Sequence, residues 1–219
     1  MSKRLQLALK RSLDVSFSLV GLCVLAIPFS VIASAIKLES LGPVFFRQER
    51  VGKNGKLFQI WKFRTMVEGA ERLGLGHTLA RGDPRITRIG RILRAWGFDE
   101  LPQLINVLKG DMSVVGPRPT LPYQVAHYDE AQRRRLSAKA GITSLGVVSG
   151  RNSLSWRERI QLDVWYVENW SLWLDLKILL KTLWVVLVKR EGLYGESGVN
   201  DPFVKPPSSI RTIDEGKPR

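Results

Sequence analysis

An uncharged stretch near the N-terminus, VSFSLVGLCVLAIPFSVIASAI at 15–36, limits most strongly how this chain can fold. As a helix, its 22 residues would be about 33 Å long, enough to cross the hydrocarbon core of a bilayer. Pro28 lies inside the stretch and kinks a helix, while the nearby Ser30 hydroxyl could satisfy a freed carbonyl. The flanks are basic on both sides: Lys3, Arg4, Lys10 and Arg11 precede the stretch, and Lys37, Arg47, Arg50, Lys53 and Lys56 follow it. Because basic flanks stay in the cytoplasm, we predict a re-entrant membrane helix that bends at Pro28 and leaves by the face it entered.

Three other interpretations of this stretch stay open. A helix that spans the membrane would place equally basic flanks on opposite sides, which the positive-inside rule disfavours. A cleaved signal peptide would have a shorter apolar core followed by a small-x-small cleavage site. A buried core helix of a soluble protein would not need so long an apolar run between basic flanks.

A β-hairpin is predicted directly after this stretch. Residues 44–48 and 57–63 have the composition of strands, and Lys53-Asn54-Gly55 between them is a turn signal. Alternation along the second strand would place Lys62 and Arg64 on the same face. Solvated hairpin charges are the alternative interpretation of these two residues.

A pair of adjacent carboxylates, Asp99 and Glu100, stands between basic clusters. Upstream of the pair lie Arg85, Arg88, Arg91 and Arg94, and downstream Gly116-Pro117-Arg118-Pro119 presents Arg118 on a stiff turn. Arginine binds phosphate bidentately, and a divalent cation can bridge a carboxylate and a phosphate, so the pattern suits a phosphate-bearing substrate. The alternative is an ordinary helix start with acidic residues in its first turn, followed by Pro102 and an apolar face.

The rest of the chain predicts an α/β protein, mostly helical with a small β-hairpin or sheet. Helices are expected at 86–96, 99–108, 122–137 and 155–168, and a short β-like run at 146–149. Arg133-Arg134-Arg135 is interpreted as a solvated surface or one that faces lipid headgroups. Tryptophans and tyrosines gather at 165–184, which predicts amphipathic helices on the membrane surface, with an ordinary core helix as the alternative. The predicted parts are a basic N-terminus with the membrane helix (1–40), a catalytic domain (41–190) and an irregular tail (191–219).

Charge and cysteine content narrow the classes of function. The net charge of +14 implies an anionic partner, whether nucleic acid, acidic lipid or a phosphorylated substrate. Cys23 is the only cysteine, so intrachain disulfides and multi-thiolate zinc sites are excluded. The two histidines, His77 and His127, are isolated and indicate no histidine-rich metal site.

Six motifs carry a resemblance to a known family. They are GPVFFRQERVG at 42–52, KFRTM at 62–66, DPRITRIGRILR at 83–94, DELPQLINVLKGDMSVVGPRP at 99–119, GRN at 150–152 and SLWLDLKILLKT at 171–182. Through them, about residues 8–187 resemble the bacterial sugar transferases, or monotopic phosphoglycosyl transferases. That family begins the assembly of exopolysaccharide, O-antigen or glycoprotein glycans.

The resemblance implies a fold, a location and a reaction. It implies a re-entrant helix broken at Pro28, with a compact catalytic domain and membrane-parallel amphipathic helices at the cytoplasmic face of the bacterial inner membrane. The reaction implied is transfer of a sugar 1-phosphate from a UDP-sugar to polyprenyl (undecaprenyl) phosphate, with release of UMP. The expected partners are these two substrates and membrane lipids, without nucleic acid, while a homodimer is left open.

The resemblance also assigns roles to residues. Asp99 would be the nucleophile that forms a covalent phosphosugar-aspartyl intermediate. Glu100 would help Asp99 hold Mg²⁺ and position the diphosphate. Gln103, one helical turn from Asp99, would contact substrate or else be a helix-surface amide. The candidates for screening the phosphate charge are Lys62, Arg64, Arg88, Arg118 and Arg151.

The chain departs from the family pattern at Ala140-Gly-Ile-Thr-Ser144, where the family usually has Pro-Gly-Ile-Thr-Gly. This departure bears on sugar or nucleotide preference more than on phosphoryl chemistry. A function from another class is a basic, membrane-tethered scaffold or nucleic-acid-binding protein. The charge would suit it, but no helix-turn-helix or aromatic-basic strand platform is present in the sequence.

Overall fold

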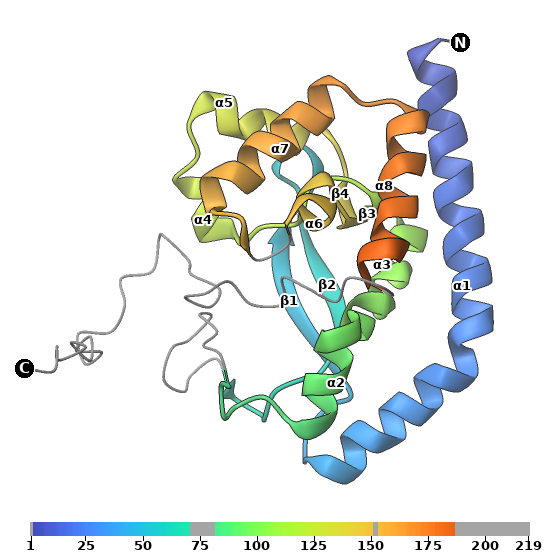
Figure 1. Ribbon diagram of the computed structural model, residues 1–219, viewed down its shortest axis with the longest axis vertical. Helices are drawn as coiled ribbons and strands as arrows, with labels where there is room; N and C mark the ends of the chain where they lie inside the picture. The colour runs from blue at the N-terminus through green and yellow to red at the C-terminus, as the bar shows by residue number, and fades with distance from the viewer. Residues whose placement is uncertain (1, 71–81, 151–152, 187–219) are drawn as a thin grey trace, which may run out of the picture.

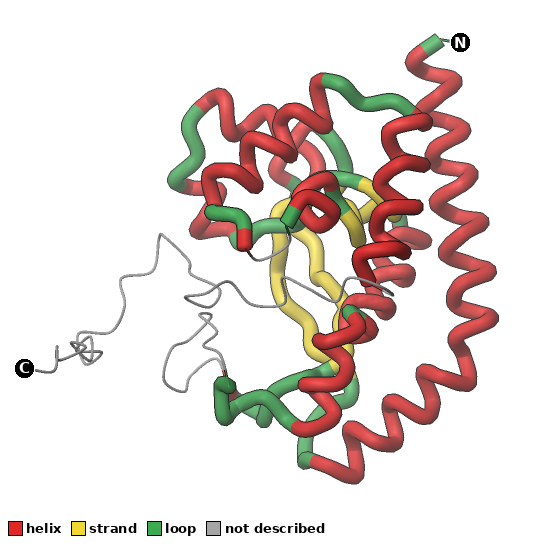
Figure 2. The backbone as a smooth tube through the Cα atoms, in the orientation of Figure 1, coloured by secondary structure: helices red, strands yellow, loops and turns green. Residues whose placement is uncertain are grey.

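The computed structural model describes residues 2–70, 82–150 and 153–186. Within these residues a long N-terminal helix, α1 (Lys3–Glu39), lies along a compact domain of short helices around two small sheets (Figures 1 and 2). The strands are β1 (Phe45–Val51), β2 (Leu57–Phe63), β3 (Met112–Val115) and β4 (Ala140–Thr143). The α-helices that follow are α2 (Arg88–Trp96), α3 (Leu104–Lys109), α4 (Pro122–Ala126), α5 (Glu130–Arg133), α6 (Leu145–Ser149), α7 (Trp156–Glu168) and α8 (Leu172–Trp184). The 3₁₀ segments that lie wholly within the described residues include η1 (Lys53–Gly55), η3 (Phe98–Gln103) and η4 (Arg134–Ser137).

The predicted β-hairpin is confirmed. Strands β1 and β2 pair antiparallel from Phe45↔Phe63 to Val51↔Leu57. The turn between them needs left-handed backbone at Asn54 (φ 55°) and Gly55 (φ 82°), and these are the residue types that adopt it most readily. The second sheet pairs β3 and β4 in parallel.

Helix α1 is attached to the domain at both of its ends. Near its start, Lys10 bonds Asp175 of α8 at 2.6 Å, and Arg11 bonds the last carbonyls of α3. Near its end, Glu39 accepts bonds from the backbone N–H groups of Arg88 and Ile89, which begin α2. The helix therefore runs beside α8 and then bends towards α2 (Figure 1).

Pro28 lies within α1, which continues through it as one helix of 37 residues. The Ser30 hydroxyl donates to the carbonyl of Ala26, at 3.0 Å. Most of the apolar run faces outward, for example Val24 and Ile27. Among the described residues, α1 is the one helix long and apolar enough to cross a membrane.

The core lies between the sheets and the helices that cover them. Its main cluster joins β2, β3 and β4 to α3, α7 and α8 through buried side chains that include Ile60, Val107, Met112, Tyr166 and Ile178. A smaller cluster seats the second half of α1 on β2 and α2 through Ile36, Phe63 and Leu93.

Several predicted elements differ in their details. The helix predicted at 99–108 is split into η3 and α3, because Pro102 within it lacks an N–H donor. The helix predicted at 122–137 is broken into α4, α5 and η4, since Asp129 caps a new start with Gln132. The run at 146–149 is helical, not β-like, because the Ser144 hydroxyl caps it as α6. The helices predicted at 86–96 and 155–168 are confirmed as α2 and α7.

The interpretation of the basic run at 133–135 as a surface is wrong for one of its members. Arg133 and Arg134 are exposed, but Arg135 is buried at 3% exposure. The aromatic region at 165–184 contains α8, which exposes Trp173, Leu180 and Trp184 while Asp175 and Ile178 are buried. Its placement on a membrane surface stays a prediction, and the predicted tail at 191–219 lies outside the described residues.

Candidate active site

The carboxylate pair lies where one helix ends and the next segment begins. Helix α2 has Thr87 as its N-cap. It ends at Gly97, which takes a left-handed conformation (φ 70°). Asp99 and Glu100 then occupy the first turn of η3. The helix-start interpretation is thus correct for the local structure, and the surroundings of the pair decide what else it can do.

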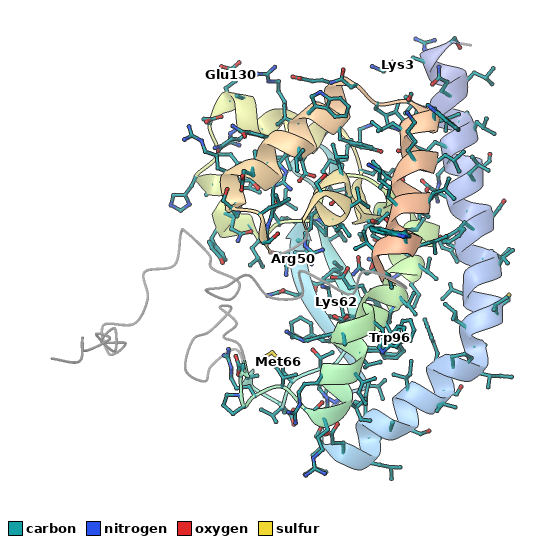
Figure 3. All side chains as sticks on the ribbon, in the orientation of Figure 1. Lys3, Arg50, Lys62, Met66, Trp96 and Glu130 are labelled. Carbon is teal, nitrogen blue, oxygen red and sulfur yellow. The ribbon has the colours of Figure 1, made fainter. Side chains whose placement is uncertain are left out.

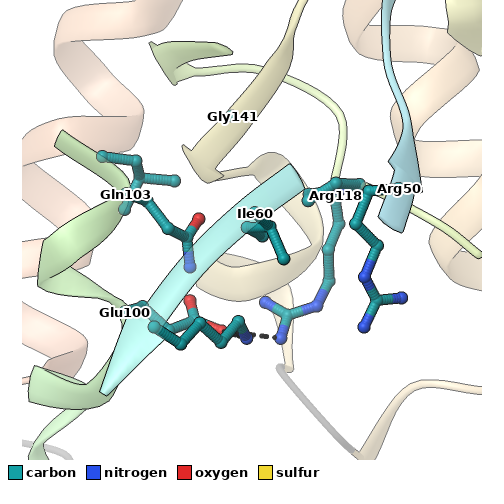
Figure 4. A pocket seen from close by; sticks show the side chains of 9 residues that line it. Arg50, Ile60, Glu100, Gln103, Arg118 and Gly141 are labelled. Atoms are coloured by element: carbon teal, nitrogen blue, oxygen red, sulfur yellow. Dashed lines mark hydrogen bonds and ion pairs between the residues drawn. The ribbon is translucent and has the colours of Figure 1, made fainter. Parts of the chain in front are cut away.

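Glu100 is held by two cations. Its Oε1 accepts a hydrogen bond from Lys62 Nζ of β2 at 2.7 Å and one from Arg118 Nη2 at 3.1 Å (Figure 4). Burial alone would raise the pKa of Glu100, but the charges of Arg118 and Lys62 hold it well below its usual range. Glu100 is therefore ionised at neutral pH and organises both cations around the site.

Asp99 has a different environment. Its carboxylate accepts no hydrogen bond from the residues that the structure describes, and its side chain is half-buried. Burial and the neighbouring charge of Glu100 raise the pKa of Asp99 to about 6, against the opposing charges of Lys62, Arg94 and Arg118. One carboxylate is thus engaged and the other is available, as a nucleophile or metal ligand requires.

The raised pKa of Asp99 predicts a pH dependence. If the ionised carboxylate attacks, kcat/KM falls about tenfold per pH unit below pH 6, because protonation removes the nucleophile. A pH–rate profile from pH 5 to 8 at fixed Mg²⁺ measures this limb. Raising the Mg²⁺ concentration should move the limb to lower pH if the metal shares this carboxylate. A flat profile between pH 5 and 7 would contradict the assignment.

A pocket opens between the hairpin and the carboxylate pair. Three cationic side chains contribute to it, and Figure 3 places two of them, Arg50 and Lys62, along the hairpin. Figure 4 shows the guanidinium groups of Arg50 and Arg118 pointing the same way at the pocket. The pocket is lined by Arg50, Ile60, Lys62, Glu100, Gln103, Arg118, Pro119, Gly141 and Ile142.

The structure brings together four of the residues selected from the sequence: Lys62, Glu100, Gln103 and Arg118, with Asp99 beside them. Gln103 is 1% exposed, so it is not the surface amide of the alternative interpretation, and its amide points into the pocket (Figure 4). A buried amide at a pocket wall can donate to and accept from a bound ligand.

Sequence reasoning missed Arg50 as a pocket residue. The signal was available, because the hairpin register pairs Arg50 with Phe58, and Phe58, Ile60 and Lys62 share one face of β2. Phe58 therefore lies on the same face as Lys62, and Arg50, which is paired with Phe58 across the hairpin, lies on that face as well. Arg64 follows the last residue of β2, Phe63, and does not line the pocket with Lys62.

Three selected cations do not join this cluster. Arg64 is buried and donates to the carbonyls of Ser40 and Leu41, so its described contacts hold the end of α1. Arg88 is exposed at the start of α2. Arg151 lies outside the described residues. The role of these three in substrate binding stays a prediction.

The donor set suits a Mg²⁺ shared with a substrate. The described residues contain no group of three or more metal-binding side chains, so an all-protein metal cage is not formed there. Mg²⁺ is commonly held by one or two carboxylates, water and substrate phosphates. Asp99 offers an unengaged carboxylate, and Glu100 lies next to it, so the two residues fit such an ion bound together with a diphosphate.

Relatives of the chain carry names that agree with this chemistry. A sugar transferase of Bacillus subtilis, EpsL, is 44% identical over 182 residues, covering 83% of this chain and 89% of the relative. The UDP-glucose:undecaprenyl-phosphate glucose-1-phosphate transferase of Caulobacter vibrioides is 45% identical over 185 residues, covering 80% and 68%. The undecaprenyl-phosphate galactose phosphotransferase of Salmonella typhimurium is 41% identical over 209 residues, covering 89% of this chain but 43% of that longer protein.

The family model described as bacterial sugar transferase matches residues 5–189. This range includes all but the first two residues of α1, together with the hairpin, the carboxylate pair and α8. None of the relatives named above is a scaffold or a nucleic-acid-binding protein, so that alternative gains no support. The match covers most of the chain, and the chain therefore belongs to the bacterial sugar transferase family.

Proposed function

We propose that this enzyme transfers a sugar 1-phosphate from a UDP-sugar to polyprenyl phosphate and releases UMP. The observation that carries the proposal is the contrast within the carboxylate pair. Glu100 is paired with Lys62 and Arg118, while the adjacent Asp99 is free to attack. The names of the Salmonella and Caulobacter relatives support undecaprenyl phosphate as acceptor and galactose or glucose as the first sugars to try.

The reaction runs in two displacements at one phosphorus atom. First, an oxygen of the Asp99 carboxylate attacks the β-phosphorus of the UDP-sugar, and the bond from that phosphorus to the bridging oxygen breaks, so UMP leaves. Next, a phosphate oxygen of the polyprenyl acceptor attacks the same phosphorus. The bond to Asp99 breaks, the carboxylate is regenerated, and the product is a polyprenyl diphosphate sugar.

The surrounding charges make these attacks feasible. A carboxylate that approaches a diphosphate would be repelled, and Lys62, Arg118 and Arg50 supply positive charge at the pocket. When bound with the diphosphate at Asp99 and Glu100, Mg²⁺ would neutralise further negative charge. Glu100 keeps Lys62 and Arg118 in place, because both cations bond the same oxygen.

Single-turnover UMP release tests this proposal. The protein in detergent with Mg²⁺ and UDP-galactose or UDP-glucose, without acceptor, should release up to one equivalent of UMP and gain the mass of a sugar phosphate. Adding polyprenyl phosphate should remove that mass and start steady turnover. UMP release that strictly requires the acceptor, without a labelled protein, would overturn the covalent mechanism. Absence of UMP release with any UDP-sugar would overturn the proposed function.

Helix α1 also bears on where the reaction occurs. Lys10 and Arg11 contact the domain near the start of the helix, and Glu39 contacts the same domain at its end. A single straight span would separate these residues by a bilayer. Their attachment to one compact domain supports the re-entrant arrangement, with the domain on the cytoplasmic face of the bacterial inner membrane.

Cysteine labelling tests this arrangement. In a Cys23→Ser background, which removes the one native thiol, single cysteines at Lys3 and Leu41 should react with an impermeant maleimide only from the cytoplasmic side. Both positions are exposed, so labelling should reach the same extent in inside-out vesicles and be at least about tenfold lower in right-side-out vesicles. Labelling of the two positions from opposite sides would show that α1 spans the membrane.

A further inference from the structure

A buried ion pair lies behind the active site. Arg135 of η4 and Asp163 of α7 are 3% and 2% exposed, and their side chains form an ion pair. Removing two charges from water is expensive, and apolar residues of similar size can often replace such a pair without loss of stability. We therefore expect the ion pair to have a function besides holding η4 to α7.

The hydrogen bonds of the ion pair indicate that this function concerns the backbone of Arg118. Arg135 Nη2 also donates to the backbone carbonyl of Arg118 at 2.9 Å, while Nη1 donates to the Tyr128 hydroxyl at 2.5 Å. Burial raises the pKa of Asp163, and Arg135 and the backbone amide of Arg118 oppose the rise. The Arg118 carbonyl thus bonds the ion pair directly, and the Arg118 amide lies close enough to Asp163 to lower the pKa of that carboxyl.

Within the turn Gly116-Pro117-Arg118-Pro119, Arg118 is flanked by two prolines. Its neighbours Pro117 and Pro119 have no N–H, so the amide of Arg118 is the one donor among the three. On its other side, the turn is bonded to β4 through Gly116 N to Thr143 O at 3.0 Å and Gly141 N to Pro117 O at 2.8 Å. The turn is consequently held from both sides.

The guanidinium of Arg118 needs such support. Its side chain is 43% exposed, and its contact with Glu100 lies at the pocket. A long, half-exposed side chain loses conformational entropy whenever it is held in one geometry. Fixing its backbone in advance removes the backbone contribution to the entropy loss and sets the point from which the side chain reaches a bound phosphate.

We propose that Arg135 and Asp163 are positioning residues, whose buried ion pair fixes the Arg118 backbone so that its guanidinium meets Glu100 and the diphosphate of the substrate. This inference rests on the proposed function for the identity of the diphosphate ligand. It assigns both residues an effect on substrate binding and turnover that passes through Arg118.

A matched control exists on the same two elements. Arg134 of η4 pairs with Glu168 of α7 at 2.7 Å, with side chains 60% and 46% exposed. This pair also links η4 to α7, but Arg134 and Glu168 do not line the pocket. Glu168→Gln should leave kcat/KM within about twofold of the wild type, because exposed ion pairs contribute little.

A double-mutant cycle tests the proposal. Asp163→Asn alone should lower kcat/KM about 10- to 100-fold, as expected when a reacting group is displaced. In an Arg118→Ala background the same change should have an effect of less than about threefold, because the group that it positions is gone. The Kd for UDP, measured by calorimetry, should follow the same pattern. The positioning role would be overturned if the losses caused by Asp163→Asn and Arg118→Ala simply multiplied in the double mutant. It would also be overturned if Asp163→Asn kept the wild-type kcat/KM and Kd.

Folding and function are separated by two further measurements. If Asp163→Asn fails to fold, Arg135→Lys keeps the positive charge but removes the planar fork, and it takes the place of Asp163→Asn in the cycle. If the wild type releases no UMP, the proposed function fails, while the cycle in the Kd for UDP still decides whether the pair acts through Arg118.

Discussion

Asp99→Asn should abolish turnover without unfolding the protein. Asparagine keeps the size of the side chain but cannot form the acyl phosphate, so steady-state UMP release should fall at least about 1,000-fold. The covalent sugar phosphate should be undetectable by mass spectrometry of the intact protein. The Asp99 side chain accepts no hydrogen bond within the described residues, so the substitution removes no described contact.

The same variant should be at least as stable as the wild type. The folded state raises the pKa of Asp99 above its usual 3.8, so the folded protein favours the protonated carboxyl. The stability that this protonated carboxyl contributes is lost as pH rises through about 6, and above that pH the ionised carboxylate destabilises the fold. At pH 7.5 the neutral asparagine relieves this penalty, which we take as about 1 kcal/mol after screening by solvent. The Tm should then rise by about 2–4 °C at pH 7.5 and change less at pH 4.5.

Asp111→Asn is the matched control for this experiment. Asp111 is also half-buried, but it follows α3 and does not line the pocket. Its substitution should leave UMP release within about twofold of the wild type. Retained turnover in Asp99→Asn would exclude Asp99 as nucleophile. A lower Tm in that variant would contradict the electrostatic environment described for the pair.

Local signals in the sequence were sufficient for the elements that surround the site. Asn54 and Gly55 supply the left-handed backbone of the hairpin, and the alternation of β2 gives the register that brings Lys62 to the pocket. Gly97 ends α2 and places Asp99 at the start of η3. Each of these features depends on residues within a few positions of one another, so pattern and spacing predict them.

The contacts that fix the cations depend on residues far apart in the sequence and could not be predicted this way. Three consecutive arginines at 133–135 look alike, and only packing against Asp163, 28 residues later, makes Arg135 the buried member. Strand alternation predicts Arg64 beside Lys62, but Arg64 donates to Ser40 at the end of α1, 24 residues before it. In both cases tertiary contacts decide where the arginine lies, and neither arginine lines the pocket.

Gly141→Ala should have the second large effect, through the backbone. Gly141 and Gly116 bring β4 and the Arg118 turn into close contact, since a Cβ at Gly141 would lie 2.6 Å from Gly116 O and closer still to Gly116 N and Thr143 O. All three are backbone atoms, which cannot rotate away. The turn must therefore move, at a cost of about 3 kcal/mol, the upper part of the range for overpacked sites.

The expected result is a loss in both stability and activity. The Tm should fall by about 6–12 °C, and kcat/KM by about 100-fold, because displacing the turn moves Arg118 away from Glu100. Gly146→Ala in α6 is the control: the nearest atom to its Cβ would be Ser144 Oγ at 3.7 Å, and alanine favours a helix. That variant should keep wild-type activity with an equal or higher Tm. If Gly141→Ala behaved like Gly146→Ala, the close contact between β4 and the Arg118 turn would not be what holds Arg118 at the site.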